Sequence, residues 1–327
     1  NISVSGGDDR ITVTGGTVRG EVRVSFGNDI FEWNGGGVIH GTIDLGEGDD
    51  AASLTSLNQS HLGATPLIDG GLGVDALSLS NITTGGLSRF QQWERLDARN
   101  DTELSFDTDL VLGDAGTGTG TLAVDATSTL YAGGGWNTGI RAFDGAQPVT
   151  LINAGRIDLT NGNTGGANDT FTIAGNYVGD NAAVYLQTVL GNDDSASDRL
   201  VISGGRASGS TGLGIFNLGG SGAATTRDGI LVVQSLDGAT STADAFVLFG
   251  PVAAGAFEYF LFKGGISPGT GENWYLRSTL VNGTTPAPAP DPDDPVSPPP
   301  PTPPEPPAPP PPELPPPPPP PPPQLPG

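Results

Sequence analysis

The sequence contains no cysteine and no methionine, and Lys263 is its only lysine. Without cysteine there are no disulfide bonds, thiolate metal ligands or thiol nucleophiles, so a stable fold needs a large apolar core. No apolar run reaches the length of about 18 residues that a membrane-spanning helix requires. The chain begins at Asn1 without a methionine or a basic and apolar leader, and we expect it to be an excised segment whose export signal has been removed.

Basic residues are scarce as a class. The 327 residues include 13 Lys and Arg against 36 Asp and Glu, which gives a formal net charge of −23. Nucleic-acid binding requires clustered Lys and Arg that neutralise phosphates, whereas here these residues are scattered along the chain. The same negative charge opposes docking on anionic lipid. We therefore expect no nucleic-acid partner and no electrostatic attachment to a membrane surface.

Proline is confined to one end of the chain. Of the 31 prolines, 27 lie within residues 286–327, while the 52 glycines lie almost entirely before them. A proline run of this kind forms an extended polyproline II helix that has no packed core and acts as a semi-rigid spacer. We predict a disordered, polyproline II linker at 282–327. A ligand for domains with aromatic grooves is the alternative interpretation of the same segment.

The Gly-rich body is dense in short stretches of alternating apolar and polar residues, each closed by Gly, Asn or Asp. Examples are 10–14 (RITVT), 21–25 (EVRVS) and 199–203 (RLVIS). Such alternation, bounded by turn-forming residues, is typical of β-strands. Apolar residues recur at every third position only in 87–96 (LSRFQQWERL), which predicts either one short helix or a broader rung of sheet.

A repeat of about 20 residues organises the N-terminal part of the body. The Gly-Asp-Asp triplet at 7–9 is followed by Gly-Asn-Asp at 27–29 and Gly-Asp-Asp at 48–50, so the spacing is nearly constant. A unit this short cannot bury its own apolar face, so it must stack on its neighbours. We predict an all-β fold, a right-handed parallel β-helix (solenoid), with a β-sandwich as the alternative.

One short motif points to calcium. Residues 70–78 (GGLGVDALS) match every fixed position of the nonapeptide G-G-x-G-x-D-x-U-x of calcium-binding rolls, whose turns offer oxygen ligands to Ca²⁺. Those rolls stack the nonapeptide in direct tandem, whereas the partial matches here lie a full repeat away. A corner of the β-helix, with Asp bonded to its own backbone, explains the same residues. A calcium-stabilised surface protein of the repeat-in-toxin kind stays an alternative.

Candidate catalytic residues are few. The only histidines are His40 and His61, and no H-E-x-x-H motif occurs. Glycoside cleavage needs paired carboxylates on one face. The adjacent pairs at 49–50 and 193–194 stand in turn-like contexts, and alternate residues of a strand point to opposite faces. We expect no catalytic, cofactor or metal site and no enzymatic activity, and a β-helical polysaccharide hydrolase or lyase is the alternative.

An ordered series of short segments occupies the last third of the body: 175–178 (GNYV), 197–203 (SDRLVIS), 207–211 (ASGST), 217–222 (NLGGSG), 225–233 (TTRDGILVV), 245–249 (AFVLF) and 273–278 (NWYLRS). Taken together, this series resembles the autochaperone segment of pertactin-like autotransporter passengers, which Gram-negative bacteria export by type V secretion. Residues 1–170 resemble these passengers only in their Gly-rich β-helical texture.

The resemblance implies three parts: a Gly-rich β-helical stem at 1–171, an autochaperone-like β-helical cap at 172–281, and a linker at 282–327 toward an outer-membrane β-barrel that this chain does not contain. Such a passenger folds outside the cell from its C-terminal end. Aromatic residues gathered late in the body would give that end the largest apolar burial. We expect the folding seed to include Tyr177, Phe246, Tyr259, Trp274, Tyr275 and Leu276.

The same resemblance implies a surface-exposed, non-enzymatic passenger segment at the bacterial cell surface or outer membrane. It would be exported through the periplasm and either retained or released, and it would act as stem and folding seed in adhesion or virulence. The expected partners are its own C-terminal β-barrel and a host-cell or matrix receptor, and the chain is expected to be a monomer. The role in adhesion follows from the family and not from any residue of this sequence.

Overall fold

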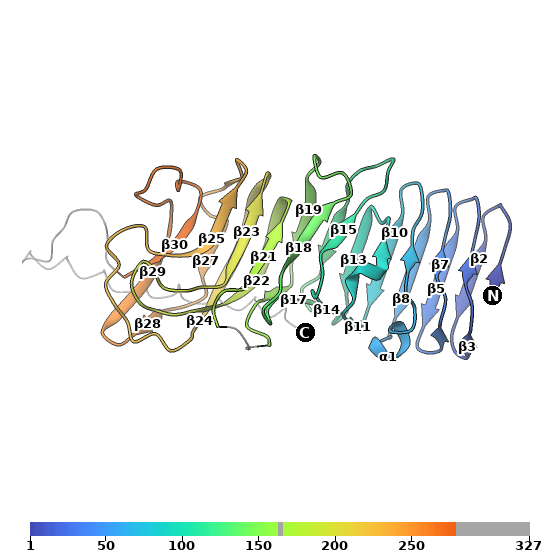
Figure 1. The fold of residues 1–327 in the computed structure, drawn as a ribbon, viewed down its shortest axis with the longest axis horizontal. Helices are drawn as coiled ribbons and strands as arrows, with labels where there is room; N and C mark the ends of the chain where they lie inside the picture. Colours follow the sequence, from blue (N-terminus) through green and yellow to red (C-terminus); the bar gives the residue numbers. More distant parts are fainter. Residues whose placement is uncertain (163–165, 279–327) are drawn as a thin grey trace, which may run out of the picture. The chain divides into compact units, whose positions relative to one another are not determined.

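The architecture is described for residues 1–162 and 166–278 of a computed structural model. The linker predicted at 282–327 and the last three residues of the predicted cap lie outside the described residues. Short strands from successive coils lie side by side and stack along a common axis (Figure 1). The stack runs from β1 (Ile2–Ser3) to the coils that contain β23 (Arg199–Ser203) and β25 (Ile230–Leu236). In the described residues the strands form four sheets.

One face of the coils carries two sheets. The first has five strands in the order β1 (Ile2–Ser3), β4 (Val22–Arg23), β7 (Ile43–Asp44), β9 (Ile68–Asp69) and β12 (Phe90–Gln91). The second has eight strands in the order β15 (Leu110–Leu112), β18 (Asn137–Ala142), β21 (Thr170–Ile173), β23 (Arg199–Ser203), β25 (Ile230–Leu236), β30 (Trp274–Arg277), β29 (Phe257–Lys263) and β28 (Val252–Ala254).

The largest sheet has fifteen strands and runs through most of the coils. Its main path is β11 (Thr83–Thr84), β14 (Glu103–Ser105), β17 (Thr129–Tyr131), β20 (Arg156–Asp158), β22 (Gly175–Thr188), β19 (Val149–Asn153), β16 (Thr121–Val124), β13 (Arg95–Arg99), β10 (Ala76–Ser80), β8 (Ala51–Thr55), β5 (Ile30–Asn34) and β2 (Arg10–Val13). β24 (Arg206–Asn217) pairs with β22, and β26 (Thr240–Ser241) and β27 (Phe246–Leu248) pair with β24. β3 (Thr17–Val18) and β6 (Val38–Ile39) form a separate pair.

The register between coils confirms the parallel β-helix. Ile2 pairs with Val22 and Val22 with Ile43, in parallel, so the first two coils have the same lengths as the steps of the sequence repeat. The next coil is longer, because Ile43 pairs with Ile68. Among the described strands, pairing becomes antiparallel at the C-terminal end, where β25, β30, β29 and β28 follow one another.

The core is built from inward-facing residues that stack in columns. In the fifteen-stranded sheet, one column of paired positions runs through Phe31, Ala52, Leu77 and Leu96, and each of these side chains is buried. Burial of one large apolar side chain contributes about 1.5–3 kcal/mol, and the column repeats this in every coil. Alternation in the strands therefore predicts the core correctly.

Glycine is required at the corners because successive coils approach closely. At Gly48 (φ 143°) an added Cβ would lie 1.9 Å from Gly27 O, and at Gly73 (φ 146°) it would lie 1.9 Å from Gly48 O. Any side chain there would push neighbouring coils apart. These contacts continue the corner column from Gly27 and Gly48 to Gly73, so the calcium-like motif at 70–78 is the next rung of the same corner.

The longer step to this rung accommodates an insertion that contains α1 (Gln59–Leu62). Asn58 caps this helix, since its side chain accepts a hydrogen bond from the Ser60 N–H at 3.0 Å. The sequence interpretation placed its possible helix at 87–96 instead. That segment contains only a 3-10 turn, η1 (Leu87–Arg89), followed by β12 and the start of β13. Within the described residues, the helices are too short to cross a membrane.

Candidate functional site

The Gly-Asp corners of successive coils form a column of carboxylates. Each carboxylate accepts a hydrogen bond from a backbone N–H of the preceding coil: Asp29 Oδ1 from Asp9, Asp50 Oδ1 from Asp29, and Asp75 Oδ1 from Asp50, all at 2.7 Å. The Asp75 N–H donates in turn to Glu94 Oε2 at 2.7 Å. The expectation that the motif's aspartate bonds its own backbone is therefore wrong, because Asp75 joins two coils instead.

These contacts account for the fixed residues of the calcium-like motif at 70–78. Its glycines at 71 and 73 lie against carbonyl groups of the preceding coil, and Asp75 is fully buried as an acceptor. Within the described ranges, no group of three or more His, Asp or Glu side chains is arranged to hold a metal ion.

Burial makes the carboxylate column sensitive to pH. Loss of hydration is the main cause that raises the pKa of Asp75 to about 7 and that of Asp50 to about 6. Neighbouring acids add to the effect on Asp75, chiefly Glu94, followed by Asp50 and Asp114. The Oδ2 atoms of Asp29, Asp50 and Asp75 are buried without a hydrogen-bond partner. The charged forms of Asp50 and Asp75 are therefore unfavourable in the folded state.

The two histidines have separate local environments. His40 is exposed between β6 and β7, and its backbone N–H donates to Val18 O at 2.9 Å. His61 lies in α1, where its Nδ1 accepts the Asn58 N–H at 3.1 Å and completes the capping box. His40 therefore lies on a coil corner, and His61 helps to cap a short helix.

The adjacent carboxylate pairs also stand in turns. Asp49 is exposed whereas Asp50 is buried, as expected for neighbours that point to opposite sides. Asp193 accepts backbone N–H groups from Thr226, Arg227 and Gly229 at 2.8–2.9 Å, and Asp194 forms an exposed ion pair with Arg227. These carboxylates are occupied in holding loops together.

Three predicted seed residues form one aromatic column inside the C-terminal coils. Tyr177 stacks on Phe246 with ring centroids 6.0 Å apart, and Phe246 meets the edge of Trp274 at 5.3 Å. The Tyr177 hydroxyl lies 2.8 Å from Thr211 Oγ1, and Trp274 Nε1 donates to Ser241 Oγ at 3.0 Å. The three aromatic residues belong to β22, β27 and β30, so the column links three strands distant in sequence.

The other three predicted seed residues are buried nearby but outside this column. Tyr259 in β29 accepts the Ala223 N–H at 2.9 Å, and its hydroxyl lies 2.8 Å from Gly191 O. Tyr275 and Leu276 belong to β30, which pairs antiparallel with both β25 and β29. Tyr259 thus fastens a loop, while Tyr275 and Leu276 lie in the terminal antiparallel sheet.

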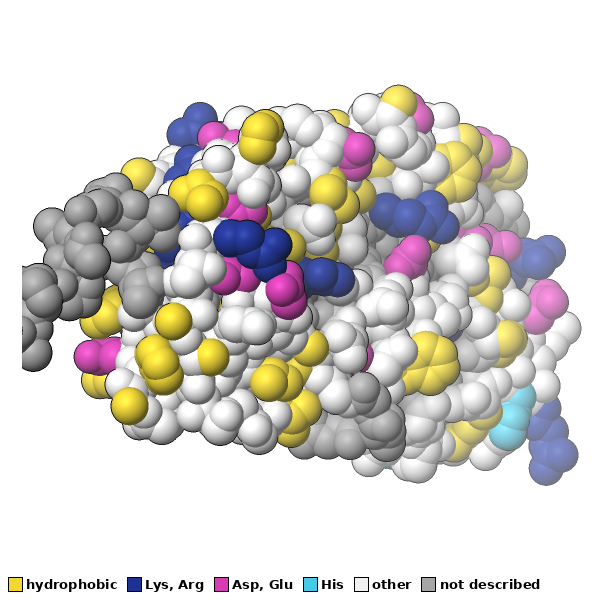
Figure 2. Space-filling view, turned by 60° about the vertical axis from the view of Figure 1, so that its left-hand side comes forward, with side chains coloured by type: hydrophobic (Ala, Val, Ile, Leu, Met, Phe, Trp, Pro, Cys, Tyr) yellow, Lys and Arg dark blue, Asp and Glu magenta, His cyan; other side chains and the backbone are white. Residues whose placement is uncertain are grey.

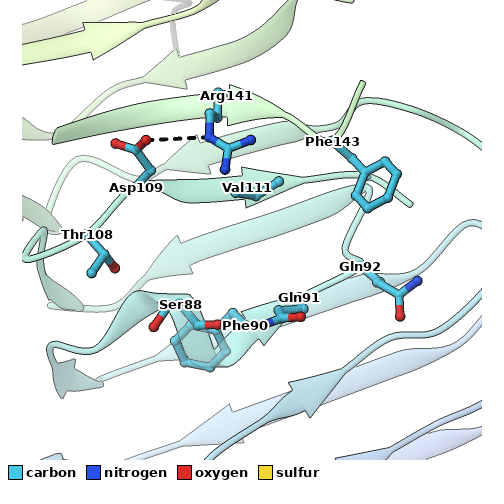
Figure 3. A pocket seen from close by; sticks show the side chains of 10 residues that line it. Ser88, Phe90, Gln91, Gln92, Thr108, Asp109, Val111, Arg141 and Phe143 are labelled. Atoms are coloured by element: carbon cyan, nitrogen blue, oxygen red, sulfur yellow. Dashed lines mark hydrogen bonds and ion pairs between the residues drawn. The ribbon is translucent and has the colours of Figure 1, made fainter. Parts of the chain in front are cut away.

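A groove interrupts the face that carries two sheets. Its volume is about 510 Å³, and it lies between β12 and β15, the facing end strands of those sheets (Figure 3). Phe90 and Gln91 line one side, Val111 and Arg141 line the other, and Phe143 stands at one end. Sequence analysis missed this groove, because strand alternation does not reveal where the ladder between two coils breaks.

Comparison with known proteins shows that one segment of the chain matches a family model. Residues 148–261 match the family model described as Autochaperone Domain Type 1. The chain is 39% identical over 204 residues to the adhesin BmaC autotransporter of Brucella suis biovar 1, and 41% identical over 120 residues to the autotransporter adhesin AIDA-I of Escherichia coli. The first match covers 59% of this chain and 6% of the relative, and the second covers 36% and 9%.

The fold has a counterpart among solved structures. The crystal structure of the Haemophilus influenzae Hap adhesin superimposes with a TM-score of 0.50 at 15% identity, over 85% of this chain and 33% of that one. The chain thus spans a small part of the length of these relatives. The family match, the relatives and the parallel β-helix agree with the resemblance seen in the sequence. The chain is a segment of a surface-exposed autotransporter passenger and carries a type 1 autochaperone segment.

Proposed function

We propose that the chain is the β-helical stem and folding seed of an adhesive, non-enzymatic passenger. In this proposal residues 1–171 form the stem, 172–281 form the seed and cap, and 282–327 connect the cap to an outer-membrane barrel in the full protein. The observation that carries the seed assignment is the buried column of Tyr177, Phe246 and Trp274, which ties a long parallel strand to the terminal antiparallel sheet.

The antiparallel sheet is suited to ending a solenoid. A parallel coil leaves an open strand edge and an open apolar end, and both favour unwanted association. Here β30 folds back on β25 and β29, so the main-chain groups of the last parallel strand find partners. A solenoid grows by adding coils to a completed template, and the capped end offers a template closed by buried aromatic side chains.

An adhesive role is supported by the relatives, which are named as adhesins. The surface also supports binding to another molecule: on the face shown in Figure 2, apolar side chains are exposed among charged ones. One exposed cluster joins Tyr185 to Phe216 at 5.5 Å and to Phe249 at 6.1 Å, with both phenylalanines more than half exposed. The carboxylates considered for catalysis are engaged in turns, which supports a non-enzymatic role.

The partners in this proposal are the chain's own barrel and a host-cell or matrix receptor, and the passenger acts as a monomer. A bead assay tests the adhesive role. Latex beads coated with the full chain should attach to cultured epithelial cells more than beads coated with albumin. Attachment no greater than that of the albumin beads would contradict the adhesive role.

A further inference from the structure

The groove between β12 and β15 lies where the coil length changes. In the fifteen-stranded sheet, Leu77 pairs with Leu96 across a short coil, whereas Leu96 pairs with Leu122 across a distinctly longer one. The additional residues of the longer coil lie between β15 and β16, and the ladder is interrupted between β12 and β15. The groove is therefore a built feature of the backbone and does not depend on one flexible side chain.

The side chains around the groove include both hydrogen-bond donors and hydrogen-bond acceptors, and together they carry little net charge. Arg141 Nε pairs with Asp109 Oδ2 at 3.4 Å, so the cation and the anion on one wall offset each other. Ser88, Gln91 and Thr108 are exposed at the rim. Gln91 Nε2 is engaged with Ser88 O at 3.0 Å, which orients its amide. Hydroxyl and amide groups both donate and accept, so the groove suits a ligand that does the same.

An aromatic ring stands at one end of this polar surface (Figure 3). Phe143 is 50% exposed, yet its backbone is fixed, since its N–H donates to Leu112 O at 2.9 Å. The next residue, Asp144, begins a tight turn in which its Oδ1 accepts the Ala146 N–H at 3.0 Å. The backbone that carries the ring is thus held in place before any ligand arrives, which lowers the entropy cost of binding.

A peptide added as a further strand does not fit between the two edges. The Gly113 N–H donates to Trp93 O at 2.8 Å, which ties the two coils together directly after β12 and β15. An inserted strand would need about 4.8 Å of separation on each side. A ligand must instead lie across the groove and contact side chains. A strongly anionic ligand is also disfavoured, because the chain carries a net charge of −23.

We propose that the groove between β12 and β15 binds a neutral oligosaccharide, with one sugar ring packed on Phe143. Sugar hydroxyls donate and accept hydrogen bonds, matching the amide and hydroxyl rim, and the C–H face of a pyranose packs on an aromatic ring. The volume of about 510 Å³ lies within the usual range for small-molecule sites. This inference deepens the proposed adhesive function and rests on it, since it names the chemical class of the receptor.

A printed array of neutral and sialylated oligosaccharides tests the proposal with the full chain. We expect binding to neutral oligosaccharides, weakened about tenfold or more by Phe143→Ala and retained by Phe143→Trp. Phe26→Ala is the matched control, because Phe26 is 58% exposed but lies outside the groove, and it should leave binding unchanged. Absence of binding, binding confined to sialylated probes, or equal binding by Phe143→Ala would overturn the proposal.

The bead assay separates this inference from the adhesive function. Beads coated with the unaltered chain that attach to cells, with Phe143→Ala beads attaching equally well, would overturn the groove as the receptor site and leave adhesion standing. Failure of the unaltered beads to attach would instead remove the adhesive function. Circular dichroism of each variant should match the unaltered chain, because both substituted side chains are at least half exposed.

Discussion

The coils before β16 and the coils from β16 onward differ in width and in how they are closed. The early coils are narrow, as in the step from Ile11 to Phe31, and their corners are joined by buried aspartates. The later coils are wider, as in the step from Tyr177 to Ala207, and an aromatic column and an antiparallel sheet close them. Buried carboxylates join coils but are unfavourable when charged, whereas aromatic packing has no such cost.

This comparison predicts that the two ends differ in how far a defect spreads. Trp33 and Trp274 are both buried indoles whose Nε1 donates a hydrogen bond, to Gly36 O at 2.8 Å and to Ser241 Oγ at 3.0 Å. Each replacement by Ala should cost about 3–5 kcal/mol locally. Trp274→Ala should make the whole body susceptible to protease, because every earlier coil builds on that end, while Trp33→Ala should expose only neighbouring coils.

Limited proteolysis with mass spectrometry measures this difference. In the unaltered chain, we expect the protease-resistant fragment to contain residues 172–281 and fragments from 1–100 to be lost first. Equal spread of cleavage in the two variants would contradict the assigned polarity, and so would a resistant core confined to the N-terminal half.

A second test acts on the narrow coils alone. Gly73→Ala places a Cβ 1.9 Å from Gly48 O and should destabilise the early coils by about 2–4 kcal/mol. Gly16→Ala is the control, since Gly16 has a positive φ of 78° but no atom within 4 Å of the added Cβ, so only backbone strain of about 1–2 kcal/mol is expected. Thermal melting followed by circular dichroism compares the two, and a Gly16→Ala loss as large as that of Gly73→Ala would refute the corner contact.

The carboxylate column predicts how stability depends on pH. Folding raises the pKa of Asp75 from its ordinary value of 3.8 to about 7, so the folded state binds more protons. The resulting stability is fully present below about 3.8 and is lost as the pH rises through 7. Melting of the early coils should therefore occur at higher temperature at pH 5 than at pH 8. One raised carboxyl contributes on the order of 1–3 kcal/mol to this change.

Asp75→Asn should reduce that pH dependence, because an amide keeps the acceptor oxygen for the Asp50 N–H without a buried charge. Asp49→Asn is the matched control: its exposed Oδ1 accepts the Val74 N–H at 2.9 Å, and Asn28 already stands at the same place one coil earlier. The same pH profile in Asp75→Asn as in the unaltered chain would show that Asp75 does not titrate as described.

Calcium should have the smallest effect. Asp75 Oδ1 and the motif's glycines are engaged in coil packing, so millimolar Ca²⁺ should leave the melting temperature nearly unchanged. A site saturated a hundredfold above its Kd would add about 2.7 kcal/mol. A rise of many degrees in Ca²⁺ that Asp75→Ala abolishes would favour the calcium-stabilised alternative.

Local patterns were sufficient for part of this structure. The strands follow from their alternation, and the β-helix follows from the corner repeat at 7–9, 27–29 and 48–50, which appears in the register of the coils. The constant spacing does not extend to the next corner, because the insertion containing α1 lengthens that step. The segment 87–96 has helical spacing, yet Phe90 and Leu96 belong to strands on different faces of the coil. The corner between these strands buries apolar residues at short intervals, which produces the same spacing as a helix.

The sites were less predictable than the fold. The aromatic identity of the seed residues is visible in the sequence, but contact between Tyr177 and Phe246 depends on coil lengths that no local pattern reports. Their role in folding stays a prediction, as do the boundaries of stem and cap. The groove lies where two sheets end, and its residues, such as Phe143 and Arg141, come from different coils and carry no shared sequence signal.

Pulse-labelling hydrogen exchange during refolding of the chain tests the central claim most directly, because it reports which amides become protected first. The account predicts early protection in β22, β24, β25 and β30, followed by protection that spreads toward β2 and β5. Protection that appears first in β2 and β5, or simultaneously along all coils, would contradict folding from the C-terminal end.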